Sequence, residues 1–145
     1  RMTRAMCAEL YQNHEVALHA LTHPFLESLS PEKCTYEILQ DRINLEKLTG
    51  RITRGMAYPF GTYSDTVVDS LKACGIVYSR TTVSTGDFNL PKDWLRLPAT
   101  CHHNDPQLME LAKNLQSLTV TKDPLKCFIC GDTPTSLKGM TIGMS

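Results

Sequence analysis

Three short apolar segments, each followed by a segment with helical periodicity, are the feature of this 145-residue sequence that most constrains its fold. The apolar segments cover residues 14–19, 55–58 and 76–78, and the helical patterns cover residues 30–50, 64–75 and 105–115. Because consecutive parallel strands need a crossover that is usually helical, this order predicts an α/β fold with a mainly parallel sheet or barrel. Three strands are too few to close a barrel alone.

Capping residues and glycines delimit the expected helices. Ser30, followed by Pro31, predicts the start of a helix that ends at Gly50. The next helix is expected from Ser64 or Asp65 to Gly75. A short N-terminal helix is expected over residues 3–11, and another over residues 105–115, opened by Asp-Pro. Spacing predicts these apolar faces: Ala5, Met6 and Leu10; Tyr36, Leu39 and Ile43; Val67, Val68, Leu71 and Cys74; Leu108, Leu111, Ala112 and Leu115.

Charge and composition exclude several classes of partner. Lys plus Arg and Asp plus Glu both number 15, which argues against nucleic acid or an anionic membrane as the main partner. No apolar run is long enough to span a bilayer. The chain begins with Arg1 and has no basic-then-apolar leader, so we expect that an N-terminal segment is missing. The six cysteines do not form the regular framework of a secreted disulfide scaffold, which favours reduced thiols but leaves compartment and oligomeric state open.

The sequence His-Ala-Leu-Thr-His-Pro places His19 and His23 four residues apart at the end of the first expected strand. Imidazole suits Zn²⁺ and similar ions, and α/β folds place their chemistry at the carboxyl ends of strands. For a bare pair, the alternative of one buried, hydrogen-bonded histidine and one solvated histidine is the better interpretation, since a metal site needs a further ligand.

Several motifs in order resemble the polysaccharide deacetylases, the NodB-homology domains of carbohydrate esterase family 4. They are Asn-His-Glu-Val at residues 13–16, the His-x-x-x-His-Pro motif, and Tyr-Pro-Phe-Gly-Thr-Tyr at residues 58–63. A helix over residues 65–75 and Ile-Val-Tyr at residues 76–78 follow. The resemblance covers about residues 10–115. It implies a deformed (β/α) barrel that here lacks its first strand or strands and its last strand.

The resemblance also implies the chemistry: metal-assisted hydrolysis of N-acetyl or O-acetyl groups on an acetylated polysaccharide, by a hydrolase acting on carbon–nitrogen bonds other than peptide bonds. By this resemblance His19 and His23 are ligands of a divalent metal, most simply zinc. The backbone N–H of Phe60 would stabilise the oxyanion, and Tyr58, Pro59 and Trp94 would contact substrate. Plain turn or loop residues are the alternative for Phe60 and Trp94, and surface loop positions are favoured for His102 and His103, whose side chains would point to opposite faces of a strand.

The chain departs from the family pattern in four places. Ala20 replaces the Ser or Thr that usually follows the first histidine. Ala57 stands where many members have an arginine, although Arg54 is close in sequence. No Asp-Asp occurs to supply the base and the third metal ligand, and no histidine follows His103 to act as the acid. We therefore expect the chain as given to be inactive.

Residues 116–145 lack a core pattern, so we expect a partial deacetylase domain over residues 1–115 and a non-family, possibly disordered tail. Back-translation of residues 126–137 in a neighbouring frame can give Trp-Gly-His-Ser-Tyr-Glu-Phe, which resembles the family's late histidine strand. A frameshifted tail is therefore our hypothesis, and Cys127 and Cys130 would then form no site. The alternatives to an enzyme fragment are a degenerate, non-catalytic metal- or glycan-binding domain and, last, a Cys-x-x-Cys redox or zinc module.

Overall fold

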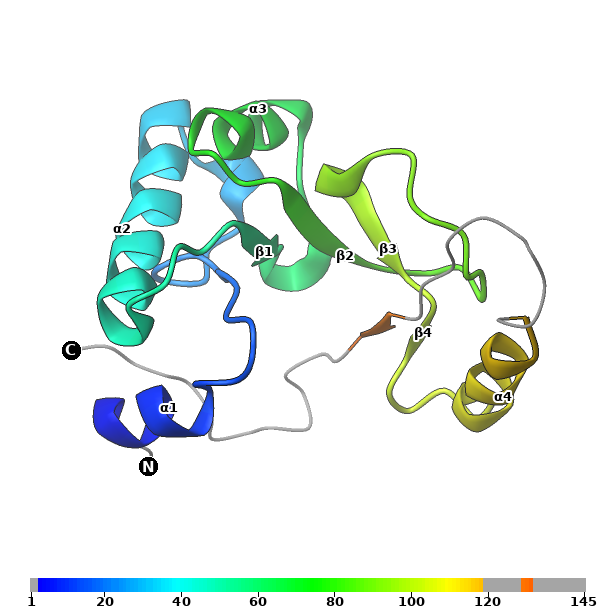
Figure 1. Cartoon of the computed structure of the whole chain (residues 1–145). Helices are drawn as coiled ribbons and strands as arrows, with labels where there is room; N and C mark the ends of the chain where they lie inside the picture. The colour runs from blue at the N-terminus through cyan, green and yellow to red at the C-terminus, as the bar shows by residue number, and fades with distance from the viewer. Residues whose placement is uncertain (1–2, 119–128, 132–145) are drawn as a thin grey trace. The chain divides into compact units, whose positions relative to one another are not determined.

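The computed structural model describes residues 3–118 and 129–131. Its elements, in order, are α1 (Arg4–Leu10), η1 (Leu26–Ser28), α2 (Pro31–Thr49), β1 (Gly55–Ala57), η2 (Pro59–Gly61), α3 (Asp65–Ala73), β2 (Tyr78–Ser84), η3 (Trp94–Arg96), β3 (Leu97–Ala99), β4 (Cys101–His102), α4 (Leu108–Leu118) and β5 (Cys130–Gly131). Helices and short strands therefore alternate, as expected (Figure 1). No helix among the described residues is both long and apolar enough to cross a membrane.

The chain divides into two compact units, and the candidate site lies in the larger one, which comprises residues 3–81 and 91–97 of the described chain. Strands β1 and β2 pair in parallel, with Gly55 opposite Tyr78 and Ala57 opposite Arg80. The order in this sheet is β1-β2-β3. The parallel α/β prediction is confirmed.

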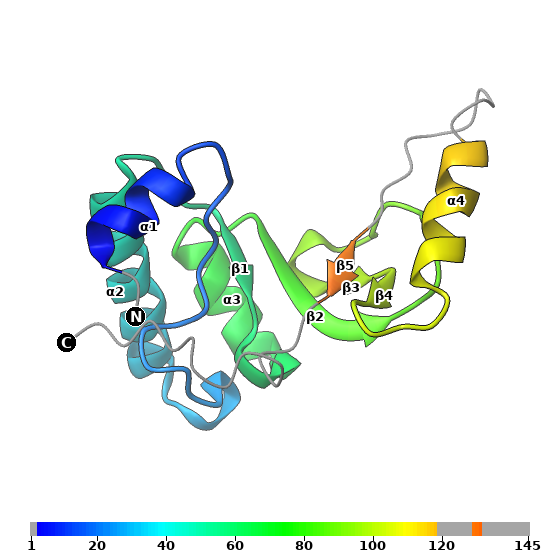
Figure 2. The same ribbon diagram turned by 90° about the horizontal axis from the view of Figure 1, so that it is seen from below.

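Helices α2 and α3 pack against each other beside β1, as both ribbon views show (Figures 1 and 2). The core joins their inner faces to β1 and to the segment that carries the two histidines. Its fully buried side chains include Leu18, Ile38, Met56 and Leu71. This core fixes the position of the histidine segment relative to α2.

Capping chemistry explains why α2 begins and ends, and why α3 begins, where they were predicted to. The Ser30 hydroxyl accepts from the Lys33 N–H, and Gly50 ends α2 in the left-handed conformation that glycine tolerates. The Ser64 hydroxyl likewise accepts from the Val67 N–H at the start of α3. The predicted face of α3 (Val67, Val68, Leu71, Cys74) is buried throughout.

The predicted apolar faces of α1 and α2 were wrong. Met6 and Leu10 of α1 are exposed, and Cys7 is its buried residue. In α2, Tyr36, Leu39 and Ile43 are exposed, whereas the buried residues are Cys34, Glu37, Ile38 and Asp41. Helical spacing shows which residues share one face of a helix, but which face is buried depends on where the sheet lies.

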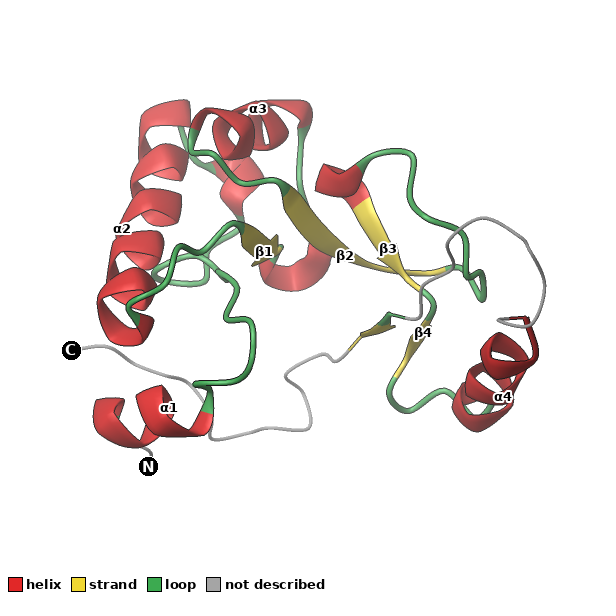
Figure 3. Cartoon of the chain, in the orientation of Figure 1, coloured by secondary structure: helices red, strands yellow, loops and turns green. Residues whose placement is uncertain are grey.

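The predicted strand over residues 14–19 was also wrong, because only Leu18 pairs, in a single parallel bridge with Met56. Figure 3 accordingly draws the chain between α1 and α2 as loop with one short helical turn. The strand expected over residues 76–78 instead begins at Tyr78 and continues to Ser84. The last predicted helix begins at Leu108 rather than Asp105.

The smaller unit holds β4, β5 and α4 among its described residues. Strands β4 and β5 pair in parallel, with Cys101 opposite Cys130. Of the expected non-family tail, residues 116–118 continue α4, and Cys130 and Gly131 form β5. Residues 119–128 and 132–145, and with them Cys127 and most of the hypothesised frameshifted tail, lie outside the described chain.

Candidate functional site

The histidine segment leaves the edge of the sheet directly after Leu18. The Leu18 N–H donates to the Gly55 carbonyl and the Leu18 carbonyl accepts from the Ala57 N–H, both at 2.9 Å. Residues 19–23, called the histidine loop below, then turn across the end of β1. A single backbone bridge therefore positions the start of this loop.

The loop brings the two predicted metal ligands together. The ring centroids of His19 and His23 are 4.6 Å apart, with the rings inclined at 63°. The His19 Nδ1 lies 2.8 Å from the Ala57 carbonyl oxygen. Because a carbonyl oxygen only accepts, Nδ1 carries the proton and the Nε2 lone pair is available to a ligand. Burial lowers the pKa of His19 and favours this neutral form, and the charges of His23 and Arg80 act in the same direction.

Three residues other than glycine adopt positive φ in the described chain, and all three lie in this region: Ala20 (64°), His23 (57°) and Phe60 (58°). This conformation costs about 1–2 kcal/mol for a residue with a Cβ atom. Such strain persists only where the surrounding structure holds it, and it clusters at functional sites.

Two buried carboxylates of α2 hold the histidine loop. Glu37 accepts from the Thr22 N–H and the Thr22 hydroxyl, both at 2.8 Å, through its two oxygens. Asp41 accepts from the His19 N–H at 2.9 Å. Burial raises the pKa of Asp41, while the hydrogen bonds from the His19 and Ala20 N–H groups lower it. Sequence reasoning missed both acids; the available signal was their four-residue spacing in α2.

Phe60 lies beside the second histidine. Its ring centroid is 4.4 Å from that of His23, and it stacks on Phe25 at 4.0 Å. The side chains of Phe25 and Phe60 are both about half exposed, at 49% and 50%. Within the described residues, the Phe60 N–H donates no hydrogen bond, whereas the Gly61 N–H donates to Tyr58.

Tyr58 and Pro59, predicted to contact substrate, are buried. The Tyr58 hydroxyl donates to the Leu95 carbonyl at 2.7 Å, and burial raises the pKa of Tyr58 to about 12. The Tyr58 side chain thus belongs to the core, so a contact between Tyr58 and a substrate would have to come from its backbone.

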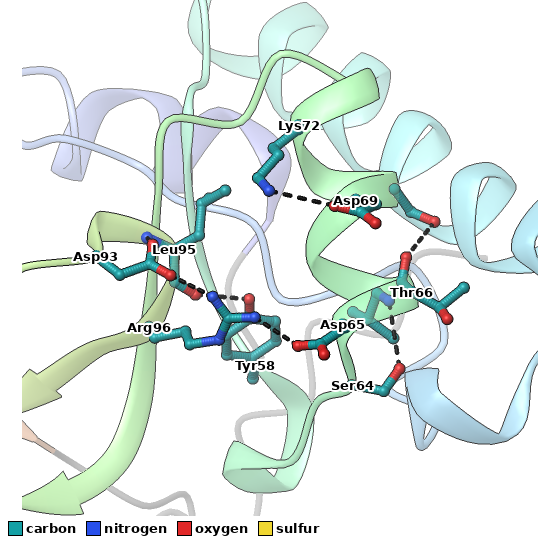
Figure 4. Close-up of polar contacts among 11 residues, drawn as sticks. Tyr58, Ser64, Asp65, Thr66, Asp69, Lys72, Asp93, Leu95 and Arg96 are labelled. Carbon is teal, nitrogen blue, oxygen red and sulfur yellow. Dashed lines mark hydrogen bonds and ion pairs between the residues drawn. The ribbon is translucent and has the colours of Figure 1, made fainter.

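Trp94, the remaining predicted substrate contact, begins η3 and is half exposed. Figure 4 shows that Arg96, in the same turn, lies between the carboxylates of Asp93 and Asp65. This ion-pair cluster ties η3 to the start of α3. In the part of the chain that the structure describes, no ring contact joins Trp94 to either histidine or to Phe60.

Ala57, which stands where many members of the family have an arginine, has a basic residue opposite it on the neighbouring strand. Arg54 precedes β1, at the opposite end of the strand from Ala57, and is exposed. Arg80 of β2 is the register partner of Ala57, and its charge contributes to lowering the pKa of His19. The cation nearest in strand register to this position therefore comes from β2 and not from β1.

His102 and His103 lie in the smaller unit. Their ring centroids are 4.2 Å apart, so the expectation that they point to opposite faces was wrong. β4 ends at His102, which removes the strand alternation on which that expectation depended. Both rings are half-buried.

The donor set available to a metal is incomplete within residues 3–118 and 129–131. No group of three or more His, Cys, Asp or Glu side chains is arranged there to hold an ion. His19 and His23 fit a metal in their chemistry and in the orientation given by the Ala57 carbonyl. They supply two ligands where three are usual in a catalytic site.

Two histidines thus follow the Leu18–Met56 bridge at the edge of a parallel α/β sheet, with their rings side by side. The sequence profile of the polysaccharide deacetylases matches residues 3–79, just over half of the chain, and the chain belongs to this family. No curated protein matches it.

Solved structures agree with this assignment. The Streptococcus pyogenes deacetylase PplD, in complex with acetate, is 26% identical with a TM-score of 0.60, over 68% of this chain and 45% of that protein. A polysaccharide deacetylase from Bacillus cereus is 24% identical with a TM-score of 0.57, over 67% and 31%. A CE4 family pseudoenzyme from Bacillus anthracis is 19% identical with a TM-score of 0.55, over 89% and 48%. The chain thus spans less than half of each of these proteins, and the last two likenesses show the fold alone.

Proposed function

We propose that this chain carries part of the active site of a metal-dependent deacetylase of acetylated polysaccharides, in which His19 and His23 bind a divalent cation, most simply Zn²⁺. The observation that carries the proposal is the hydrogen bond of 2.8 Å between His19 Nδ1 and the Ala57 carbonyl, beside the ring of His23. Metal-binding histidines usually donate their second ring N–H in this way, which fixes the tautomer and the ring orientation.

The metal, when bound, would polarise an acetyl carbonyl and lower the pKa of a water molecule. The contribution of the chain itself is to hold the His19 imidazole neutral with the His23 ring close to it, and to present the Phe60 N–H next to His23. A backbone N–H without an acceptor can stabilise the negative charge that develops on a carbonyl oxygen. Phe60 would act through its backbone alone.

We further propose that the chain as given does not turn over substrate. The carboxylates that bond to the histidine loop, Glu37 and Asp41, are already occupied by its N–H and O–H groups. Neither is therefore available as a general base. A third metal ligand, a base and an acid would have to come from outside the described residues.

These occupied carboxylates also favour a second candidate, a degenerate domain that binds metal or glycan without catalysis. The two candidates predict the same weak metal binding but differ in acetate release. Restoring an Asp-Asp segment ahead of the chain and a late histidine strand behind it should restore acetate release only if the enzyme proposal holds.

Metal content tests the ligand assignment. Purified chain equilibrated with Zn²⁺ should retain more zinc than His19→Ala and His23→Ala, measured by plasma mass spectrometry. His14→Ala, which removes an exposed histidine outside the histidine loop, should behave as the unmodified chain. Equal zinc in all four proteins would contradict the ligand assignment, and acetate release from an acetylated oligosaccharide by the unmodified chain would contradict its inactivity.

A further inference from the structure

Two acidic side chains on the buried face of α2 hold the conformation of the histidine loop. Glu37 and Asp41 are one helical turn apart in α2, and each is only 9% exposed. They share the buried face of α2 with Cys34 and Ile38. Carboxylates are rarely buried unless they are paired, because burial removes their hydration.

Within the part of the chain that the structure describes, these two carboxylates form no ion pair. Their partners are instead the Thr22 N–H and hydroxyl for Glu37, and the N–H groups of His19 and Ala20 for Asp41. Hydrogen bonds to an ionised acceptor are stronger than neutral ones.

These bonds hold a strained loop at its first two residues and at Thr22, the residue before its last. Ala20 and His23 have positive φ, and neither is a glycine. The bonds to Asp41 fix the loop where it starts, at His19, and those to Glu37 fix it at Thr22, directly before His23. Without them, the two residues would be expected to relax to ordinary φ values and to separate the histidine rings.

We infer that Glu37 and Asp41 are positioning residues that set the two histidine rings for a divalent cation before the cation arrives. The inference rests on the proposed metal site. A loop ordered in advance binds its ligand more tightly, because less conformational freedom is lost at binding. The two acids do not touch the metal; they act through the backbone of residues 19–22.

The test measures Zn²⁺ affinity of the full chain by titration calorimetry, and the visible spectrum of bound Co²⁺ as a report on coordination geometry. Glu37→Ala should weaken Zn²⁺ binding by about tenfold or more, as loss of outer-shell partners does at other metal sites, and should change the Co²⁺ spectrum. Glu37→Gln should retain both readouts, since its amide oxygen can accept from the Thr22 N–H while its NH₂ donates to the Thr22 hydroxyl.

Two further variants are controls that separate weaker Zn²⁺ binding from loss of folding. Thr22→Val removes one of the bonds to Glu37 but keeps the size of the side chain, so it should weaken Zn²⁺ binding while the far-ultraviolet circular dichroism spectrum remains that of the folded chain. Glu32→Ala removes an exposed acid from the same helix and should leave Zn²⁺ affinity unchanged.

The outcomes separate the two proposals. If the unmodified chain binds Zn²⁺, and Glu37→Ala and Thr22→Val bind it equally well, the positioning role is refuted while the metal site stands. If the unmodified chain and His19→Ala bind Zn²⁺ alike, the metal site itself is refuted, and the positioning role with it. Weaker binding in Glu37→Ala and Thr22→Val, with binding retained in Glu37→Gln, supports the inference.

Discussion

Gly55 is the position where a single added methyl group should most disturb the strand that supports the histidine loop. A Cβ atom at this residue would lie 2.0 Å from Cζ of Tyr78, whose ring covers Gly55 from the neighbouring strand. To place Cζ at the 3.4 Å of an ordinary van der Waals contact with this Cβ atom, the Tyr78 ring would have to move by about 1.4 Å. The Tyr78 hydroxyl donates to the Glu15 carboxylate at 2.8 Å, and this bond would break as the ring moves.

The expected loss of stability in Gly55→Ala follows from these two changes. Overpacking of this kind costs about 1–3 kcal/mol. The lost Tyr78–Glu15 hydrogen bond, at the surface, adds about 1 kcal/mol. We therefore expect the free energy of unfolding to fall by about 2–4 kcal/mol, and the unfolding temperature of a chain of this size by roughly 7–13 °C.

Urea unfolding followed by far-ultraviolet circular dichroism measures this loss. The double variant Gly55→Ala, Tyr78→Ala should be more stable than the sum of the single effects predicts, by about 1–3 kcal/mol, because removing the ring removes the collision. Gly50→Ala is the matched control. Gly50 has positive φ but nothing within 4 Å of its Cβ position, so its effect should simply add to that of Tyr78→Ala. An additive result for Gly55 and Tyr78 would refute the collision.

Three further predictions concern the surroundings of the site. Tyr58→Phe should lower the free energy of unfolding by about 1–3 kcal/mol, because it leaves the Leu95 carbonyl without its donor; denaturant unfolding checks this. Ile38→Ala, at a side chain with no exposure, should cost about 2–5 kcal/mol in the same assay, and a smaller effect would show that the cavity collapses. The hydrogen bond from Arg96 lowers the pKa of Asp93 from its ordinary value of 3.8. The stability that this bond contributes is therefore present when the pH is above that ordinary value, and it is lost as the pH falls through the lowered pKa of the folded state. Asp93→Asn should therefore show a shallower loss of stability in acid, and an unchanged acid profile would contradict the pairing.

The sequence predicted those features of the fold that depend on local chemistry. Ser30 and Ser64 start their helices and Gly50 ends one, because capping requires only neighbours in the chain. The strand predicted ahead of His19 failed because a strand exists only where a partner pairs with it, and here Leu18 alone meets Met56. Pairing partners distant in sequence are not visible in a short apolar pattern.

The candidate site likewise has a part that the sequence predicts and a part that only the structure reveals. The juxtaposition of His19 and His23 was predictable from their spacing and from the neighbouring motifs. The roles of Glu37 and Asp41 were not, because acids on a helix normally face water, and only the fold reveals that this face of α2 is turned inward. Once Cys34 and Ile38 are known to be buried, the helical period places both acids beside them.

The bonds that shape the histidine loop have one more consequence, which concerns the order of folding. They join residues only 15, 22 and 38 positions apart: Thr22 to Glu37, His19 to Asp41 and His19 to Ala57. The entropy lost in closing such short loops is small, and contacts close in sequence form early. The histidine loop should therefore become ordered as soon as α2 docks on β1, ahead of any contact that must wait for chain far away in sequence.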